Sequence, residues 1–183
     1  MGSKTTIRRV LSVVGVCVQL LFFIFSMFFY VPGWWYMDRG AGGEHAGGLY
    51  QYCLKILGSD WTCGEIDKDF AERFMGHKWG AYIAMRAFAT MAHLFGFALL
   101  ILLYVNICVK HKIVAGVTMV LAMVDVLFVL IGSAVASGTF GKVGDADTDT
   151  AYAAFMVWIS WIWSIAVGGI SVGILFVTIK DDY

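Results

Sequence analysis

Two cysteines are the residues whose spacing most clearly predicts covalent chemistry in this chain. Cys53 and Cys63 lie in one long polar connection, and the residues between them include the turn-forming segment Gly58-Ser59-Asp60. Aromatic, extended segments flank both cysteines, which favours two strands joined by a tight turn. If the connection faces an oxidising compartment, we predict a disulfide across this hairpin, worth about 2–3 kcal/mol. The alternative, a metal-binding pair, lacks neighbouring His or Cys partners.

Two ionisable residues, His93 and Asp125, lie within long apolar segments at similar depth. Such residues are costly inside a membrane and indicate function by default. We predict that they pair. A buried structural pair is the favoured interpretation over proton or ion transport, because only Gln19 and Thr90 add polar groups at a useful depth.

The sequence carries no motif that indicates catalysis, so we predict that the protein is not an enzyme and has no cofactor. It has no nucleophile elbow, Cys-x-x-Cys pair, metal cluster or phosphate loop. The glycine-rich run 39–48 is interpreted as a flexible loop. The 13 basic residues balance 13 acidic ones and leave no basic face, which argues against a nucleic-acid partner.

The composition is too apolar for a soluble domain. Hydrophobic residues make up 60% of the 183, with a mean hydropathy of +0.79, and a soluble domain of this length cannot bury that much apolar surface. Four segments are long enough to span a bilayer. The predicted spans are 10–31, 82–109, 113–135 and 153–179. They are separated by an outer loop 32–81, an inner turn 110–112 and a second outer loop 136–152, and are followed by a tail 180–183.

Basic residues near the spans predict the orientation. They are Lys4, Arg8, Arg9, Lys110, Lys112 and Lys180, and with four spans all of them fall on one side. That side is predicted to be cytoplasmic. Both termini are then inside and the cysteine pair is outside, where disulfides form.

A motif spread over the first outer loop resembles that of a known family. Trp34 follows the first span, Gly48-Leu49-Tyr50 precedes Cys53 by two residues, nine residues separate Cys53 from Cys63, and Arg86 stands at the outer start of the second span. This pattern is similar to the claudin superfamily, which includes claudins, peripheral myelin protein and calcium-channel gamma subunits. The family usually has Trp where this chain has Tyr50, and the short, glycine-rich gap before Gly48 indicates a divergent or invertebrate member.

The resemblance implies an all-α membrane protein, a left-handed four-helix bundle that carries a small extracellular antiparallel sheet. It implies a tight-junction protein at cell–cell contacts of the plasma membrane, which binds lipid and copies of itself in cis and in trans. Such a protein forms or regulates a paracellular barrier or charge-selective pore, and Asp60, Glu65 and Asp67 are the candidates for charge selectivity. The alternative is an auxiliary subunit of an ion channel or receptor. Claudins dock to scaffold domains through a final aliphatic residue, and because the chain ends at Tyr183 we do not expect this binding.

Small residues and two possible lipidation sites complete the predictions. Ser160, Ser164 and Gly168 repeat every four residues, and Gly169 and Gly173 form a Gly-xxx-Gly on an adjoining face of the last span. Packing within the bundle is the favoured interpretation, and a docking face for a partner's helix is the alternative. Cys108, beside the inner turn, is a candidate for palmitoylation or a lone buried thiol, and Gly2 fits the loose myristoylation pattern.

Overall fold

The computed structural model describes the backbone of residues 2–27, 36–40, 43–47, 49–56, 58–69, 79–140 and 151–180. Side chains are described for residues 4–26, 49–56, 58–69, 79–135 and 159–180. Trp34 and Gly48 of the family motif, and the centre of the second outer loop, lie outside the described residues.

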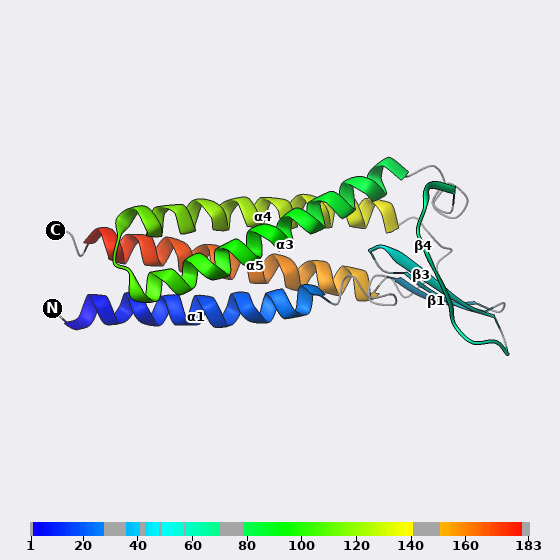
Figure 1. The fold of residues 1–183 in the computed structure, drawn as a ribbon, viewed down its shortest axis with the longest axis horizontal. Helices are drawn as coiled ribbons and strands as arrows, with labels where there is room; N and C mark the ends of the chain where they lie inside the picture. The colour runs from blue at the N-terminus through cyan, green and yellow to red at the C-terminus, as the bar shows by residue number, and fades with distance from the viewer. Residues whose placement is uncertain are drawn as a thin grey trace. The chain divides into compact units, whose positions relative to one another are not determined.

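Four long helices account for most of the described chain (Figure 1). They are α1 (Gly2–Met27), α3 (Trp79–Cys108), α4 (Lys112–Phe140) and α5 (Ala151–Lys180). Each contains a segment long and apolar enough to cross a membrane, which confirms the four predicted spans as helices. Helix α1 begins eight residues before the predicted span, because hydropathy locates the apolar part of a helix and not its polar end.

A four-stranded antiparallel sheet follows α1 along the chain. Its strands are β1 (Tyr36–Gly40), β2 (Gly43–Gly47), β3 (Gln51–Ile56) and β4 (Thr62–Glu65), paired in sequence order. The interpretation of 39–48 as a flexible loop is wrong, since residues 39–40 and 43–47 belong to the β1–β2 hairpin. Backbone pairing needs no particular side chain, and β3 offers β2 a complete edge to pair with.

The contacts divide the chain into two compact units. One contains Met1–Ile24, Thr90–Leu130 and Ser160–Tyr183, and the other contains Phe25–Ala89 and Ile131–Ile159. The first is called the helical unit here. Its core is formed by buried apolar residues on α3, α4 and α5: Leu99, Leu103, Ala115, Ala122, Val167 and Ile174. The second, called the sheet unit, has its own buried cluster of Leu49, Ile66, Tyr82 and Met85.

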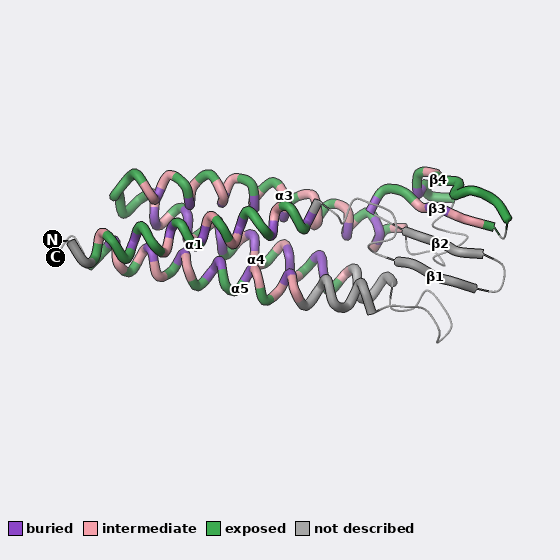
Figure 2. Tube along the Cα trace, turned by 90° about the horizontal axis from the view of Figure 1, so that it is seen from below, coloured by how far each residue is buried: buried purple, intermediate pink, exposed green. Residues whose placement is uncertain are grey.

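The exposed surface of the helical unit is strongly apolar. Leu94, Ile113, Ile162 and Phe176 are all more than half exposed. In Figure 2, buried and exposed positions alternate along each helix with the helical period, so that every helix has an inner and an outer face. Large apolar side chains on the outer faces are what a lipid environment requires.

Gly15 on α1 marks a tight helix–helix approach in the helical unit. A Cβ at this position would lie 3.0 Å from Leu103 Cδ2 and 3.1 Å from Ile170 Cγ2, whereas a Cβ at Gly116 on α4 would meet nothing within 4 Å. We predict that Gly15→Val destabilises the protein by about 1–3 kcal/mol through overpacking. Gly116→Val, which has the same intrinsic helix preference, should change stability by less than about 0.5 kcal/mol. Thermal unfolding in detergent, followed by circular dichroism, checks both, and equal effects would contradict the packing described here.

Candidate functional site

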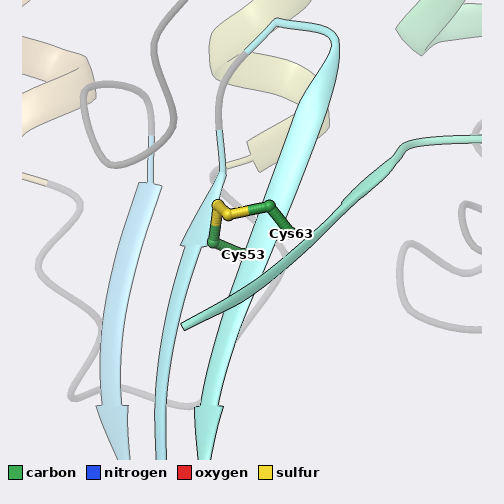
Figure 3. Close-up of a disulfide and its surroundings, with 2 residues drawn as sticks. All are labelled: Cys53 and Cys63. Carbon is green, nitrogen blue, oxygen red and sulfur yellow. A yellow bond between two sulfur atoms is a disulfide. The ribbon is translucent and has the colours of Figure 1, made fainter. Parts of the chain in front are cut away.

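The disulfide predicted from the sequence is present. Cys53 on β3 and Cys63 on β4 are directly opposite in the strand register and joined by an S–S bond of 2.04 Å (Figure 3). The bond therefore crosses the two strands of one hairpin. The other two cysteines, Cys17 and Cys108, are free and exposed. Cys108 is thus not a buried thiol, and its palmitoylation stays a prediction.

The turn between β3 and β4 follows the sequence signal at Gly58-Ser59-Asp60. The Ser59 amide and hydroxyl both donate to the Ile56 carbonyl at 2.9 Å. Gly58 adopts φ +86°, the left-handed conformation that a third turn residue of this kind requires and that L side chains rarely adopt. The described residues of the turn, 58–61, are all exposed. A closed turn and a cross-strand disulfide together fix the shape of this end of the hairpin.

The other end of the hairpin is held to α3 by Arg86 and Tyr82. Arg86 Nε donates to the Leu49 carbonyl at 2.8 Å and Nη2 donates to the Ile66 carbonyl at 3.1 Å. The Tyr82 hydroxyl donates to the same Leu49 carbonyl and accepts a bond from Arg86 Nη2 at 3.1 Å. We call these four residues the clamp. Hydrogen bonds from a charged donor are stronger than neutral ones, so the clamp is a strong attachment of the hairpin to the helix.

Aromatic rings surround the guanidinium group of the clamp. The Arg86 Cζ atom lies 4.4 Å from the ring centre of Tyr82, 4.7 Å from that of Tyr50 and 5.9 Å from that of Trp79. Tyr50, which stands where the family pattern has Trp, therefore supplies a π face to the cation. Leu49, the middle residue of the same segment, is fully buried beside Met85. Leu49 and Tyr50, two described residues of the predicted family motif, thus contact Met85 and Arg86 of α3.

The structure separates the three acidic residues predicted to tune charge selectivity. Glu65 pairs with Gln51 at the clamped end of the sheet, and it lines a pocket of about 350 Å³ together with Arg86. Asp67 follows two residues later and is exposed. Asp60 lies in the β3–β4 turn, at the other end of strand β3, which is about 17 Å long at 3.3–3.4 Å per residue. All three acidic residues are close to Cys63 in the sequence. The hairpin nevertheless places Asp60 at one end and Glu65 at the other.

His93 and Asp125 both lie in the helical unit. The His93 ring contacts Phe23 of α1, with ring centres 4.7 Å apart. Asp125 is 2% exposed, and its Oδ1 lies near the backbone of Gly96 on α3. A direct pair between the two side chains stays a prediction.

The small residues of α5 lie mostly inside the bundle. Ser160, Ser164 and Gly168 are buried, and a Cβ at Gly168 would lie 3.7 Å from Val126 of α4. Gly173 faces α1, where its Cβ position is 3.4 Å from Leu11 Cδ1. Gly169 is exposed and has no atom near its Cβ position within 4 Å. Gly169 therefore leaves an open notch on the outer face of α5.

Basic residues of α1 perform a second task that the sequence analysis missed. Arg8 is almost fully buried, and its Nη1 donates to the carbonyls of Asn106 at 2.5 Å and Val109 at 2.7 Å. Lys4 Nζ donates to the carbonyl of Lys180 at 2.8 Å. Two basic side chains thus satisfy carbonyls at the C-terminal ends of α3 and α5, where cations are favourable. The only signal in the sequence was the spacing of Arg8 and Ser12. Residues four positions apart lie on the same face of a helix, and here that face of α1 is buried.

Comparison with known proteins does not assign a family to this chain. No family model matches it, and no curated protein does. Membership of the claudin superfamily therefore stays a prediction from the residues of the motif.

The clamp predicts a sharp difference between arginine and lysine at position 86. Arg86→Lys keeps the charge but cannot reach the Leu49 and Ile66 carbonyls with two separate nitrogens. We expect a loss of about 2–3 kcal/mol and faster proteolysis of the first outer loop in the full-length protein. Arg9→Lys, at an exposed position on α1, is the matched control and should behave as the unmodified protein. Thermal unfolding and limited proteolysis in detergent measure both effects, and equal behaviour of the two variants would rule out the clamp as an attachment.

Proposed function

We propose that this chain is a claudin-like adhesion protein of the plasma membrane, which seals or selectively opens the space between contacting cells. Four apolar helices anchor it, and a disulfide-linked hairpin is attached rigidly to one of them. In this proposal the sheet faces the extracellular space and both termini are cytoplasmic. Among the described residues of the chain, no cluster of His, Cys, Asp and Glu could hold a metal ion.

One observation carries the proposal: the unclamped end of the hairpin exposes large apolar side chains. Ile56 is 57% exposed and Trp61 is 40% exposed, and both flank the β3–β4 turn. A soluble loop that displays an aromatic anchor in a fixed position supports a protein contact, because Trp is enriched at energetic centres of interfaces. The disulfide and the clamp lower the entropic cost of binding, since the turn is ordered before contact.

We propose a second copy of the chain as the partner, either beside it in the same membrane or across the gap between two cells. The acidic residues then have two locations. Asp60 lies next to the apolar contact at the turn, whereas Glu65 and Asp67 lie at the clamped end. In a paracellular passage, carboxylates that line the wall lower the barrier for cations.

The second candidate function is an auxiliary subunit of a channel or receptor, and the notch at Gly169 favours it. Gly169 lies on the outer face of α5 between Ile165 and Val172, which are both exposed. Small residues allow a partner helix to approach closely in a membrane. In that case the apolar turn would contact the partner's ectodomain.

Expression in cells that lack junction strands tests the adhesion function. We expect the tagged protein to concentrate at contacts only where both neighbouring cells express it. Trp61→Ser should abolish this enrichment while surface expression is retained, because it removes the aromatic anchor. Gln51→Ser, an exposed position at the clamped end of the same hairpin, should keep the enrichment. Diffuse surface distribution of the unmodified protein, with a channel co-purifying in mild detergent, would favour the auxiliary-subunit function instead.

Paracellular conductance tests the role of the acidic residues. In monolayers that express the protein, we expect a preference for Na⁺ over Cl⁻, which the double variant Glu65→Gln, Asp67→Asn reduces by removing two negative charges. Asp69→Asn, also exposed and two residues further along, is the control for a change of net charge. A preference that falls equally in the control would assign the effect to overall charge and not to the two residues.

A further inference from the structure

The interior of the helical unit contains more polar side chains than the sequence analysis recognised. One face of α1 buries Arg8, Ser12 and Gln19 at spacings of four and seven residues. On α5 the buried polar residues are Ser160, Ser164, Ser171 and Thr178. Gln19 and Thr90 were the polar residues expected at a useful depth, because other isolated Ser and Thr residues do not interrupt an apolar segment and are easily overlooked. The bundle is therefore able to surround an ionisable group with hydrogen-bonding groups.

Asp125 is the ionisable group that this interior does not satisfy. It is 2% exposed, and its Oδ1 atom has no hydrogen-bond partner among the described residues. An ionised carboxylate in this position would hold a full negative charge away from water. Its Oδ1 atom would also accept no hydrogen bond, and both effects are strongly unfavourable in a protein interior. Elsewhere in the helical unit, the Ser12 and Ser164 hydroxyls on α1 and α5 also have no partner among the described residues.

Gly96 brings Asp125 and Gln19 to the same point of α3. A Cβ at position 96 would lie 3.0 Å from Gln19 Nε2 and 3.8 Å from Asp125 Oδ1, so both polar groups approach a backbone that has no side chain. Gln19 Nε2 donates to the Gly96 carbonyl at 3.2 Å. Gln19 Nε2 carries a second N–H, but Asp125 Oδ1 accepts no hydrogen bond from any donor in the described part of the chain, and Gln19 Oε1 is itself an acceptor.

The helices around Asp125 supply little opposing charge. Arg8 is committed to the carbonyls at the end of α3, and between 10 and 27 on α1 the only titratable residue is Cys17, which is exposed. On α3, His93 lies one turn from Gly96 against Phe23, and Arg86 belongs to the clamp in the other unit. Between 113 and 135 on α4, Asp125 is the sole ionisable residue, and the described part of α5 before Lys180 has none.

The ionised Asp125 carboxylate and the Gln19 Oε1 atom are both acceptors, so a hydrogen bond between these oxygens needs a proton. We propose that Asp125 binds a proton at the centre of the helical unit, and that Gln19, held at Gly96, positions the protonated carboxyl group. The proton comes from a hydronium ion of the aqueous phase: one O–H bond of hydronium breaks, one O–H bond forms on the Asp125 carboxylate, and water is released. This site is independent of the adhesion function and of the acidic residues of the outer loop.

Proton binding at Asp125 has a thermodynamic consequence. In the unfolded chain the Asp125 side chain is exposed to water. Such a carboxyl group has already lost its proton when the pH reaches neutrality. If the folded protein keeps the proton at neutral pH, it binds more protons than the unfolded chain, so its stability falls as pH rises through that range. The effect disappears when residue 125 cannot titrate.

Infrared difference spectroscopy of the full-length protein in phosphatidylcholine vesicles tests the site directly. At pH 7 we expect a carbonyl band of a protonated carboxyl group, which Asp125→Asn removes and which the exposed control Asp69→Asn leaves unchanged. Gln19→Leu should shift this band to higher frequency, because it removes the hydrogen bond to the carboxyl group. The absence of the band from the unmodified protein, or its persistence in Asp125→Asn, would overturn the proposal, and an unshifted band in Gln19→Leu would overturn the role of Gln19.

Unfolding at two pH values gives a second readout. We expect the unmodified protein to have lower thermal stability at pH 8 than at pH 5, and the variant His93→Gln to show the same difference. In Asp125→Asn the difference in thermal stability between pH 5 and pH 8 should be smaller. Loss of the difference in His93→Gln but not in Asp125→Asn would assign the proton to His93 and reject the site. If Na⁺ at fixed pH, added in place of K⁺, abolished the infrared band, the site would be a sodium site and the proposal would fail.

Discussion

The attachment of the outer hairpin to α3 depends on one backbone carbonyl, that of Leu49. This oxygen accepts hydrogen bonds from both Tyr82 and Arg86, while Arg86 also binds the carbonyl of Ile66 across the hairpin. The sheet unit buries Leu49 and Ile66 against α3, so their carbonyls lose access to water and need donors from the protein. A planar guanidinium meets this need for two strand ends at once, and aromatic rings stabilise its charge.

The same constraint governs the C-terminal ends of α3 and α5. A helix leaves its last carbonyls without partners, and close to lipid these oxygens cannot all rely on water. In the helical unit Arg8 and Lys4 of α1 supply the donors for the ends of α3 and α5. Asn106 adds a bond to Thr118 on α4, at 2.7 Å. Basic residues that orient a chain in the membrane can therefore also hold its helices together.

What could be predicted from the sequence was local or compositional. Apolar length predicts the four helices, and the cysteine spacing with its glycine turn predicts the β3–β4 hairpin and its disulfide. The β1–β2 hairpin was missed because glycine-rich strands carry no alternating pattern and rely on pairing with β3. The separation of Asp60 from Glu65 follows from the hairpin register, which sequence distance conceals. The partners of Arg8 depend on contacts about a hundred residues away, which no local pattern encodes.

The buried polar residues of the helical unit differ in how they can be satisfied. Thr118, Ser171 and Thr178 each donate to the carbonyl four residues earlier in their own helix, at 2.7–2.9 Å, so they need nothing from a neighbouring helix. Asp125 has no such option, because an ionised carboxylate has no hydrogen to donate and a helix carbonyl has none to offer. Its requirement can be met only by a donor from another helix or by a proton from outside. Since Gln19 donates to the Gly96 carbonyl and no donor among the described residues bonds to Asp125 Oδ1, the proton is the simpler solution, and Gly96 is the residue that makes room for both groups.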